Sequence, residues 1–162
     1  MPFVKLLIIA IGKLKDDAEA VLFRRYSERL DPFARSIGIG PLATIELGDA
    51  RGSAIERKRA EASDILSRKP SGFMLAALHE AGETPSSAQF AAWLKSCRDE
   101  RVAGVAFVIG GADGHGGAVL SNAPKTISLS RMTLTHGLAR VLLAEQIYRA
   151  CTIIAGHPYH RG

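Results

Sequence analysis

Short apolar segments alternate along this chain with longer segments in which apolar residues recur at helical spacing. The first, Val4–Ile11, is apolar along nearly its whole length, as expected for a strand that is covered on both faces. We predict strands at Val4–Ile11, Leu42–Leu47, Phe73–Leu78, Val102–Ile109 and Ile127–Leu129. We predict helices at Asp16–Ile37, Ser53–Arg68, Ser86–Arg98 and His136–Ala150, and a short helix before the last strand. This order predicts the α/β class, with a mostly parallel open sheet and helices on both of its faces.

The ends of the predicted helices carry residues that fit these boundaries. Asp16 and Asp17 place negative charge at the start of the first helix, and Pro32 implies a break or kink near its end. Thr135 is suited to cap the last helix. No linker, repeat or low-complexity tract divides the 162 residues, and this length is enough to bury a core. We therefore expect a single domain over residues 1–162.

The first residues fit a buried strand better than an export signal. The apolar run is short, no small-residue cleavage site follows it, and the charged segment Lys13–Asp17 comes at once. No run approaches the roughly 18 apolar residues that cross a bilayer. Cys97 and Cys151 form no CxxC motif, and we expect both to be reduced and buried. These features predict a cytoplasmic protein with no membrane partner.

Basic residues outnumber acidic ones, which gives a net charge of +5 and a pI of about 9.5. Exposed basic side chains attract phosphate, so this balance favours a polyanionic partner such as a nucleic acid. Solubility alone explains the same charge, and both interpretations stay open at this point.

A glycine-rich turn follows the fourth predicted strand, and residues 110–117 read GGADGHGG. Ligands of α/β sheets gather beyond the carboxyl ends of strands, so the loops after Leu78, Ile109 and Leu129 are the candidate binding region. The turn lacks the GK[ST] of a P-loop and the G-x-G-x-x-G spacing of a dinucleotide site. It is either a tight connection to a helix or a loop that lets a nucleotide-like ligand approach the backbone closely.

The segment Ser128–His136 mixes small hydroxyl residues with Leu and Met. Apolar contacts combined with backbone hydrogen bonds suit an adenine ring and a thioether. Helix capping accounts equally well for Thr133 and Thr135, and core packing accounts for Leu129 and Leu134. The segment on its own therefore leaves ligand binding and structure as equal interpretations.

The last predicted helix and the tail after it carry unusual patterns. Most faces of His136–Ala150 are apolar, which predicts burial or a subunit interface, and Glu145 is spaced to pair with Arg149. Residues 156–162 read GHPYHRG, where a terminus usually carries indifferent polar residues. Histidine, tyrosine and arginine together offer proton transfer, base stacking and phosphate contact. No carboxylate or cysteine lies beside the two histidines, so we expect no metal site.

Together these segments resemble the ribosomal RNA large subunit methyltransferase H family of the SPOUT superfamily. The resemblance covers essentially the whole sequence, although it is weak at the first strand and Gly12–Leu14. The segments that carry it are Phe107–Gly111, Ser128–Ser130, Met132–Leu134 with His136, Ala139–Leu143, Glu145–Ala150 and His157–Arg161. The sequence departs from the family pattern at His79, His115 and Thr135, where an acidic residue, a hydrophobic residue and a proline are common.

The resemblance implies a homodimer with a C-terminal trefoil knot, in which S-adenosylmethionine lies among three loops. The cofactor contacts that it implies are Leu78, Gly110, Gly111, Leu129, Ser130, Arg131, Met132, Thr133 and Leu134. It also implies the substrate, a pseudouridine of 23S rRNA in the assembled 70S ribosome, methylated at N3.

Methylation of an imide nitrogen requires that its proton leaves or that charge on the flanking carbonyl groups is stabilised. Four residues are the catalytic candidates: His160 and Tyr159 for proton handling or base stacking, and Arg149 and Arg161 for charge stabilisation. The cofactor carries the reactive group, so no metal is required. Two other functions stay open, namely methylation of a different RNA such as transfer RNA, and a non-catalytic role in ribosome binding or assembly.

Overall fold

The computed structural model describes all residues from Met1 to Gly162, and five parallel strands form its sheet. The strands are β1 (Val4–Ile11), β2 (Ile39–Leu47), β3 (Phe73–Glu83), β4 (Gly104–Ile109) and β5 (Lys125–Ile127). Their order across the sheet is β2-β1-β4-β3-β5. The predicted α/β architecture with a parallel sheet is confirmed.

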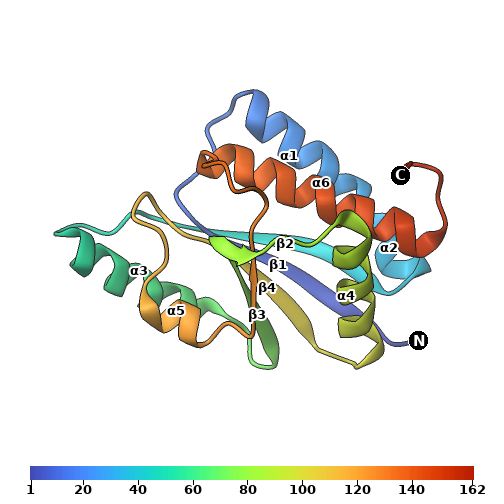
Figure 1. Cartoon of the computed structure of the whole chain (residues 1–162), viewed down its shortest axis with the longest axis horizontal. Coiled ribbons are helices and arrows are strands. Elements are labelled where there is room, and N and C mark those ends of the chain that lie inside the picture. Colours follow the sequence, from blue (N-terminus) through green and yellow to red (C-terminus); the bar gives the residue numbers. More distant parts are fainter.

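Helices cover both faces of the sheet (Figure 1). One face carries α1 (Ala18–Arg29), α2 (Asp31–Ser36), α4 (Ser87–Asp99) and α6 (His136–Ala155). The other face carries α3 (Ala54–Arg68) and the short α5 (Gly117–Ser121). Each of the two layers encloses its own cluster of buried hydrophobic side chains. Helices on both faces therefore match the prediction from the sequence.

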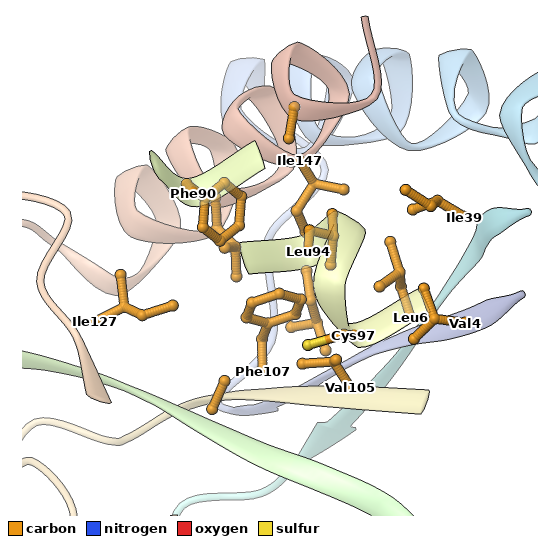
Figure 2. Close-up of a cluster of buried hydrophobic side chains, with 14 of the residues drawn as sticks. Val4, Leu6, Ile39, Phe90, Leu94, Cys97, Val105, Phe107, Ile127 and Ile147 are labelled. Carbon is orange, nitrogen blue, oxygen red and sulfur yellow. The ribbon is translucent and has the colours of Figure 1, made fainter. Parts of the chain in front are cut away.

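The central strands β1 and β4 are apolar because both of their faces are buried. Ile8 and Phe107 belong to the core under α4 and α6, whereas Ile9 and Val108 belong to the core under α3. Figure 2 shows Phe107 on the sheet with Phe90 of α4 packed over it. Burial of a side chain of this size contributes roughly 1.5–3 kcal/mol, so this layer fixes the register of the central strands.

The boundaries of two predicted helices change. The predicted break near Pro32 is confirmed, because the segment Asp16–Ile37 forms two helices that meet at Leu30, and Pro32 lies in the first turn of α2, where a missing N–H is tolerated. The last helix runs beyond Ala150 to Ala155, because its buried face continues and only Gly156, in the left-handed conformation, ends it.

The strand boundaries move as well. Strand β3 does not stop at Leu78 but continues through an irregularity to Glu83, where it pairs with β5 again. Strand β5 ends at Ile127, so Leu129 lies in the following loop and not in a strand. Strand β2 begins before the predicted Leu42, and β4 begins after the predicted Val102. The earlier end of β5 lengthens the loop that follows it at the carboxyl edge of the sheet.

Both cysteines are buried free thiols, as predicted. Burial is the main cause that raises the pKa of Cys97 to about 11 and that of Cys151 to about 12, so both thiols stay protonated at neutral pH. None of the helices combines the length and the continuous apolar character that a bilayer crossing requires.

Arg140 is buried in the second turn of α6, with only 1% of its surface exposed. Its guanidinium group pairs with Glu46 at the end of β2 and donates a hydrogen bond to the carbonyl oxygen of Gly12 at 3.1 Å. Glu46 also accepts a hydrogen bond from the backbone N–H of Leu14 at 2.9 Å. One network thus holds α6, β2 and the loop after β1 together.

We expect Arg140→Met to lower the free energy of unfolding by about 2 kcal/mol at pH 7, because it removes the charged hydrogen bonds of the buried Arg140 to the partly exposed Glu46 and to Gly12. Burial would raise the pKa of Glu46, but hydrogen bonds from Arg140 and Leu14 and the charge of Arg140 hold it below its usual range. The pair therefore stabilises the protein fully at pH values above about 4.3, the usual pKa of a glutamate in the unfolded chain. This stabilisation is lost as the pH falls through the lower pKa that Glu46 has in the folded protein. Urea denaturation of both proteins at pH 7 and in acid measures the effect, and equal stability at pH 7 would contradict it.

Candidate functional site

A cleft of about 1080 Å³ lies where β1, β4 and β5 end. Three segments form most of its wall: the part of β3 from Leu78 to Glu80, the turn after β4 and the loop after β5. The volume is close to the upper end of the range for small-molecule sites, about 300–1,000 Å³. The cleft is at the strand ends at which the sequence predicted a ligand.

Most of the predicted cofactor contacts line this cleft. They are Leu78, Gly110, Gly111, Leu129, Ser130, Met132, Thr133 and Leu134. Arg131 is the exception, since it is exposed and does not line the cleft. The sequence did not single out Lys13, Lys15, Asp49 and Lys58, which also line it. Of these, only Lys13 lies in the segment Gly12–Leu14, where the resemblance is weak.

The turn after β4 is closed on itself and tied to α3. The N–H of Gly114 donates to the carbonyl oxygen of Gly111 at 3.0 Å, and Gly114 has a φ of 80° that favours glycine. Arg57 of α3 donates two hydrogen bonds to the carboxylate of Asp113, at 2.8 and 3.1 Å. These bonds from Arg57, more than its charge, hold the pKa of Asp113 below its usual range.

Gly110 and Gly111 have no room for a side chain. A Cβ atom at Gly110 would lie 3.0 Å from the carbonyl carbon of Gly114, and one at Gly111 would lie 2.9 Å from Oε1 of Glu61. Glu61 is itself buried in α3. The sequence left two explanations of these glycines, a tight connection and the close approach of a ligand. The protein atoms around both Cβ positions support the tight connection, and the contact with a ligand stays a prediction.

His115 closes the back of the turn. Its side chain is buried, and its Nε2 lies 3.2 Å from the carbonyl oxygen of Val108, to which it donates when the ring is neutral. Burial is the main cause that lowers the pKa of His115, which keeps the ring neutral at pH 7. The histidine therefore fills, as a buried neutral ring, a position where the resembling family commonly has a hydrophobic residue.

The hydroxyl groups after β5 shape the second wall of the cleft. The hydroxyl of Ser128 donates to the carbonyl oxygen of Ser130 at 2.8 Å, and the N–H of Met132 donates to the hydroxyl of Ser130 at 2.9 Å. Thr135 caps α6 by accepting from the N–H of Leu138 at 3.3 Å, which confirms the predicted cap. The structural interpretation of these hydroxyl groups is confirmed, and the predicted ligand contacts of the same wall stay a prediction.

The tail folds back onto α6. Gly156 turns the chain at a φ of 72°, and the N–H of His157 donates to the carbonyl oxygen of Thr152 at 2.9 Å. The ring of Tyr159 then lies edge-on against Tyr148, with 4.8 Å between the centroids. The tail is therefore packed structure, which its few apolar residues did not predict.

Three of the four catalytic candidates, Arg149, Tyr159 and His160, meet around Glu145, and we call these four residues the tail cluster. Glu145 accepts hydrogen bonds from Arg149 at 2.6 and 3.0 Å, which confirms the predicted pair, and it accepts one from the Tyr159 hydroxyl at 3.1 Å. The Nη1 of Arg149 lies 3.1 Å from Nδ1 of His160. Burial, followed by hydrogen bonding to Tyr26 and Glu145, raises the pKa of Tyr159 to about 12. The fourth candidate, Arg161, is exposed and makes no hydrogen bond or ion pair.

The cleft and the tail cluster lie at opposite ends of α6. His136 and Ala139 line the cleft, whereas Arg149 lies further along the same helix, about 15 Å from Ala139 at 1.5 Å per residue. Figure 1 shows the C-terminus at the end of α6 that is remote from these loops. The predicted cofactor contacts and the predicted catalytic residues are therefore not brought together within one chain.

The neighbouring helices α1 and α6 expose large apolar side chains on the surface. Val21 and Leu22 of α1 are 47% and 37% exposed, and Leu138 and Leu142 of α6 are 45% and 40% exposed. We call these four residues the α1–α6 apolar surface. The last helix was expected to be buried or to form an interface, and one face of it is buried while Leu138 and Leu142 are exposed. Within the chain, no group of three His, Cys, Asp or Glu side chains could hold a metal ion.

Comparisons with known proteins place the chain among methyltransferases. A family model described as "Predicted SPOUT methyltransferase" matches residues 4–160. A ribosomal RNA large subunit methyltransferase H from Rhodopseudomonas palustris is 44% identical over 159 residues, which are 98% of this chain and 99% of that protein. A protein of the same name from Methylocella silvestris is 41% identical over 159 residues, with the same coverage of both chains.

Solved structures are more distant. The SpoU methyltransferase AviRb from Streptomyces viridochromogenes, in complex with the cofactor AdoMet, is 12% identical with a TM-score of 0.44. That match covers 96% of this chain and 62% of AviRb, so the chain spans less than two thirds of the length of AviRb.

Proposed function

Because the chain belongs to the SPOUT methyltransferase family, we propose that it methylates 23S rRNA in the assembled ribosome, at N3 of a pseudouridine, with S-adenosylmethionine as methyl donor. The observation that carries this proposal is the identity of 44% over almost the full length of a ribosomal RNA large subunit methyltransferase H. The net charge of +5 agrees with an RNA partner. The family relationship also supports a C-terminal trefoil knot, a single domain and action in the cytoplasm.

The cleft fits this cofactor. Leu78, Leu129 and Leu134 offer apolar surface to an adenine ring, and Gly110 and Gly111 line the cleft with backbone groups that can form hydrogen bonds to a ligand. When bound, the cofactor supplies a methyl group on a positively charged sulfur. The turn carries neither phosphate-binding fingerprint, so we expect no comparable binding of ATP or NAD.

We propose that two copies of the chain build each active site. The tail cluster with Arg149, Tyr159 and His160 is too far along α6 to reach the cleft of its own chain. A second copy packed on the α1–α6 apolar surface would bury Leu138 and Leu142, which one chain leaves in water. In this arrangement the tail of one copy supplies polar groups to the methyl donor bound by the other.

Leu142→Glu is expected to shift the protein from dimer to monomer, with at least a tenfold weaker self-association, because it places a charge on the proposed interface. Light scattering over a concentration series measures the change. Ile55→Glu is the matched control, since Ile55 is 71% exposed on α3, on the other face of the sheet, and should leave the mass unchanged. A wild-type protein that is monomeric and active at micromolar concentration would refute the shared active site.

Methyl transfer from labelled S-adenosylmethionine to purified RNAs tests the function as a whole. We expect incorporation into 70S ribosomes and none into transfer RNA. Incorporation into transfer RNA would favour a SPOUT enzyme with another substrate, and ribosome binding without cofactor binding would favour the non-catalytic role.

A further inference from the structure

The contact between Arg149 and His160 fixes the state of the histidine ring. The Nη1 of Arg149 lies 3.1 Å from Nδ1 of His160. A guanidinium group has five N–H donors and no acceptor, so Nδ1 must accept this hydrogen bond. A neutral imidazole that accepts through Nδ1 carries its proton on Nε2. The ring therefore offers an N–H donor on the side away from Arg149.

The Nε2 atom of His160 has no hydrogen-bond partner within the chain, and it is accessible to solvent. The ring is half-buried, so this N–H is presented at the surface, close to Gly162 at the end of the chain. The donor is held in place because Arg149 is itself held by two hydrogen bonds to Glu145. A donor on a fixed ring is suited to stabilise charge that develops on an oxygen.

The other polar groups of the tail are not free to accept a proton. Nδ1 of His157 accepts the backbone N–H of Tyr159 at 3.2 Å, which leaves its proton on Nε2 as well. The hydroxyl of Tyr159 donates to Glu145, and Glu145 Oε1 already accepts from both Arg149 and Tyr159. Neither tail histidine has an unoccupied basic nitrogen in its neutral form.

We propose that His160 acts as a hydrogen-bond donor to a carbonyl oxygen beside the methylated nitrogen, with Arg149 as the positioning residue that fixes its tautomer, and does not act as the base. The proposal rests on the proposed methylation of a pseudouridine. In that reaction a bond forms from the methyl carbon to N3, the bond from that carbon to sulfur breaks with its electron pair passing to sulfur, and the N3 proton passes to water. The negative charge that N3 shares with its flanking carbonyl oxygens is what the Nε2–H stabilises.

The tautomer can be measured without any substrate. Nitrogen-15 NMR of the full-length protein distinguishes the two ring nitrogens of each neutral histidine, and His160→Gln identifies the signals of His160. We expect a protonated Nε2 and an unprotonated Nδ1. A ring protonated on Nδ1 would overturn the proposal, whether or not the protein methylates ribosomes.

Two substitutions separate a donor from a base. His160→Gln keeps an N–H donor near the place of Nε2, whereas the shorter amide of His160→Asn keeps an acceptor near the place of Nδ1 for Arg149 but places no donor at Nε2. Neither amide is a base at neutral pH. If the donor matters, kcat on 70S ribosomes should stay within about tenfold of wild type in His160→Gln and fall by about 100-fold or more in His160→Asn.

Equal loss in both variants would overturn the proposal in favour of a base, and loss only in His160→Gln would overturn it in favour of a purely structural contact with Arg149. A wild-type protein that does not methylate ribosomes would instead refute the proposed function. The NMR experiment would still show whether Arg149 fixes the tautomer of His160, because it needs no substrate.

Discussion

Deletion of Tyr159–Gly162 is expected to reduce methyl transfer to ribosomes by about 100-fold or more, because it removes the donors that face the substrate. Cofactor affinity should stay within about twofold, since none of the residues that line the cleft belongs to the deleted segment. Methyl transfer at saturating cofactor and calorimetry with S-adenosylmethionine measure the two effects separately. A truncated protein that methylates ribosomes at the normal rate would show that the tail is not part of the active site.

The same deletion has a structural cost that the sequence did not predict. Tyr159 packs against Tyr148 and donates to Glu145, and the loss of an aromatic pair of this kind costs about 1 kcal/mol. In a domain of this size such a loss lowers the melting temperature by roughly 2–4 °C. The assays therefore have to run well below the midpoint. Tyr159→Phe is the control, since it keeps the ring on Tyr148 and removes only the hydroxyl group.

Gly111→Val is expected to weaken S-adenosylmethionine binding by about 30-fold or more, which corresponds to about 2 kcal/mol of overpacking strain. The reason is that Oε1 of the buried Glu61 and Cγ2 of Ile11 lie 2.9 and 3.2 Å from the Cβ position, so either the turn or these side chains have to shift, and the wall of the cleft changes shape. Titration calorimetry measures the affinity, and circular dichroism checks that the sheet survives.

Gly117→Val is the matched control for this substitution. Gly117 belongs to the same glycine-rich run, but nothing lies within 4 Å of its Cβ position, so we expect nearly normal cofactor binding. Normal binding by Gly111→Val would show that the turn after β4 is a structural connection only. Equal losses in both variants would show that the position of helix α5, and not the shape of the turn at Gly111, controls the affinity for S-adenosylmethionine.

The periodicity of the sequence was enough to predict the layers but not all the boundaries. Strands such as β1 and β4 are buried on both faces, so their apolar runs stand out from the surrounding sequence. The end of α6 was misplaced because the pattern was followed only to Ala150, although Gly156 is a helix-ending signal that the sequence offers. The second half of β3 is exposed and irregular, so no alternation marked it.

The candidate site was predictable only where neighbouring residues in the sequence form it. The turn after β4 and the loop after β5 were found because each is one continuous segment. Lys58 and Glu61 reach the same region from α3, through packing between distant parts of the chain that no local pattern encodes. The length of the last helix did offer one further prediction. A helix from His136 to Arg149 already separates the predicted cofactor contacts from the predicted catalytic residues.

Methylation of purified 70S ribosomes that lack the modification, with the product nucleoside identified by mass spectrometry, tests the central claim most directly. We predict that the wild-type protein transfers the methyl group of S-adenosylmethionine to N3 of a pseudouridine in 23S rRNA, and that transfer RNA and free 23S rRNA remain unmodified. Methylation at another nucleoside, or binding of the cofactor with no transfer to ribosomes, would contradict the claim.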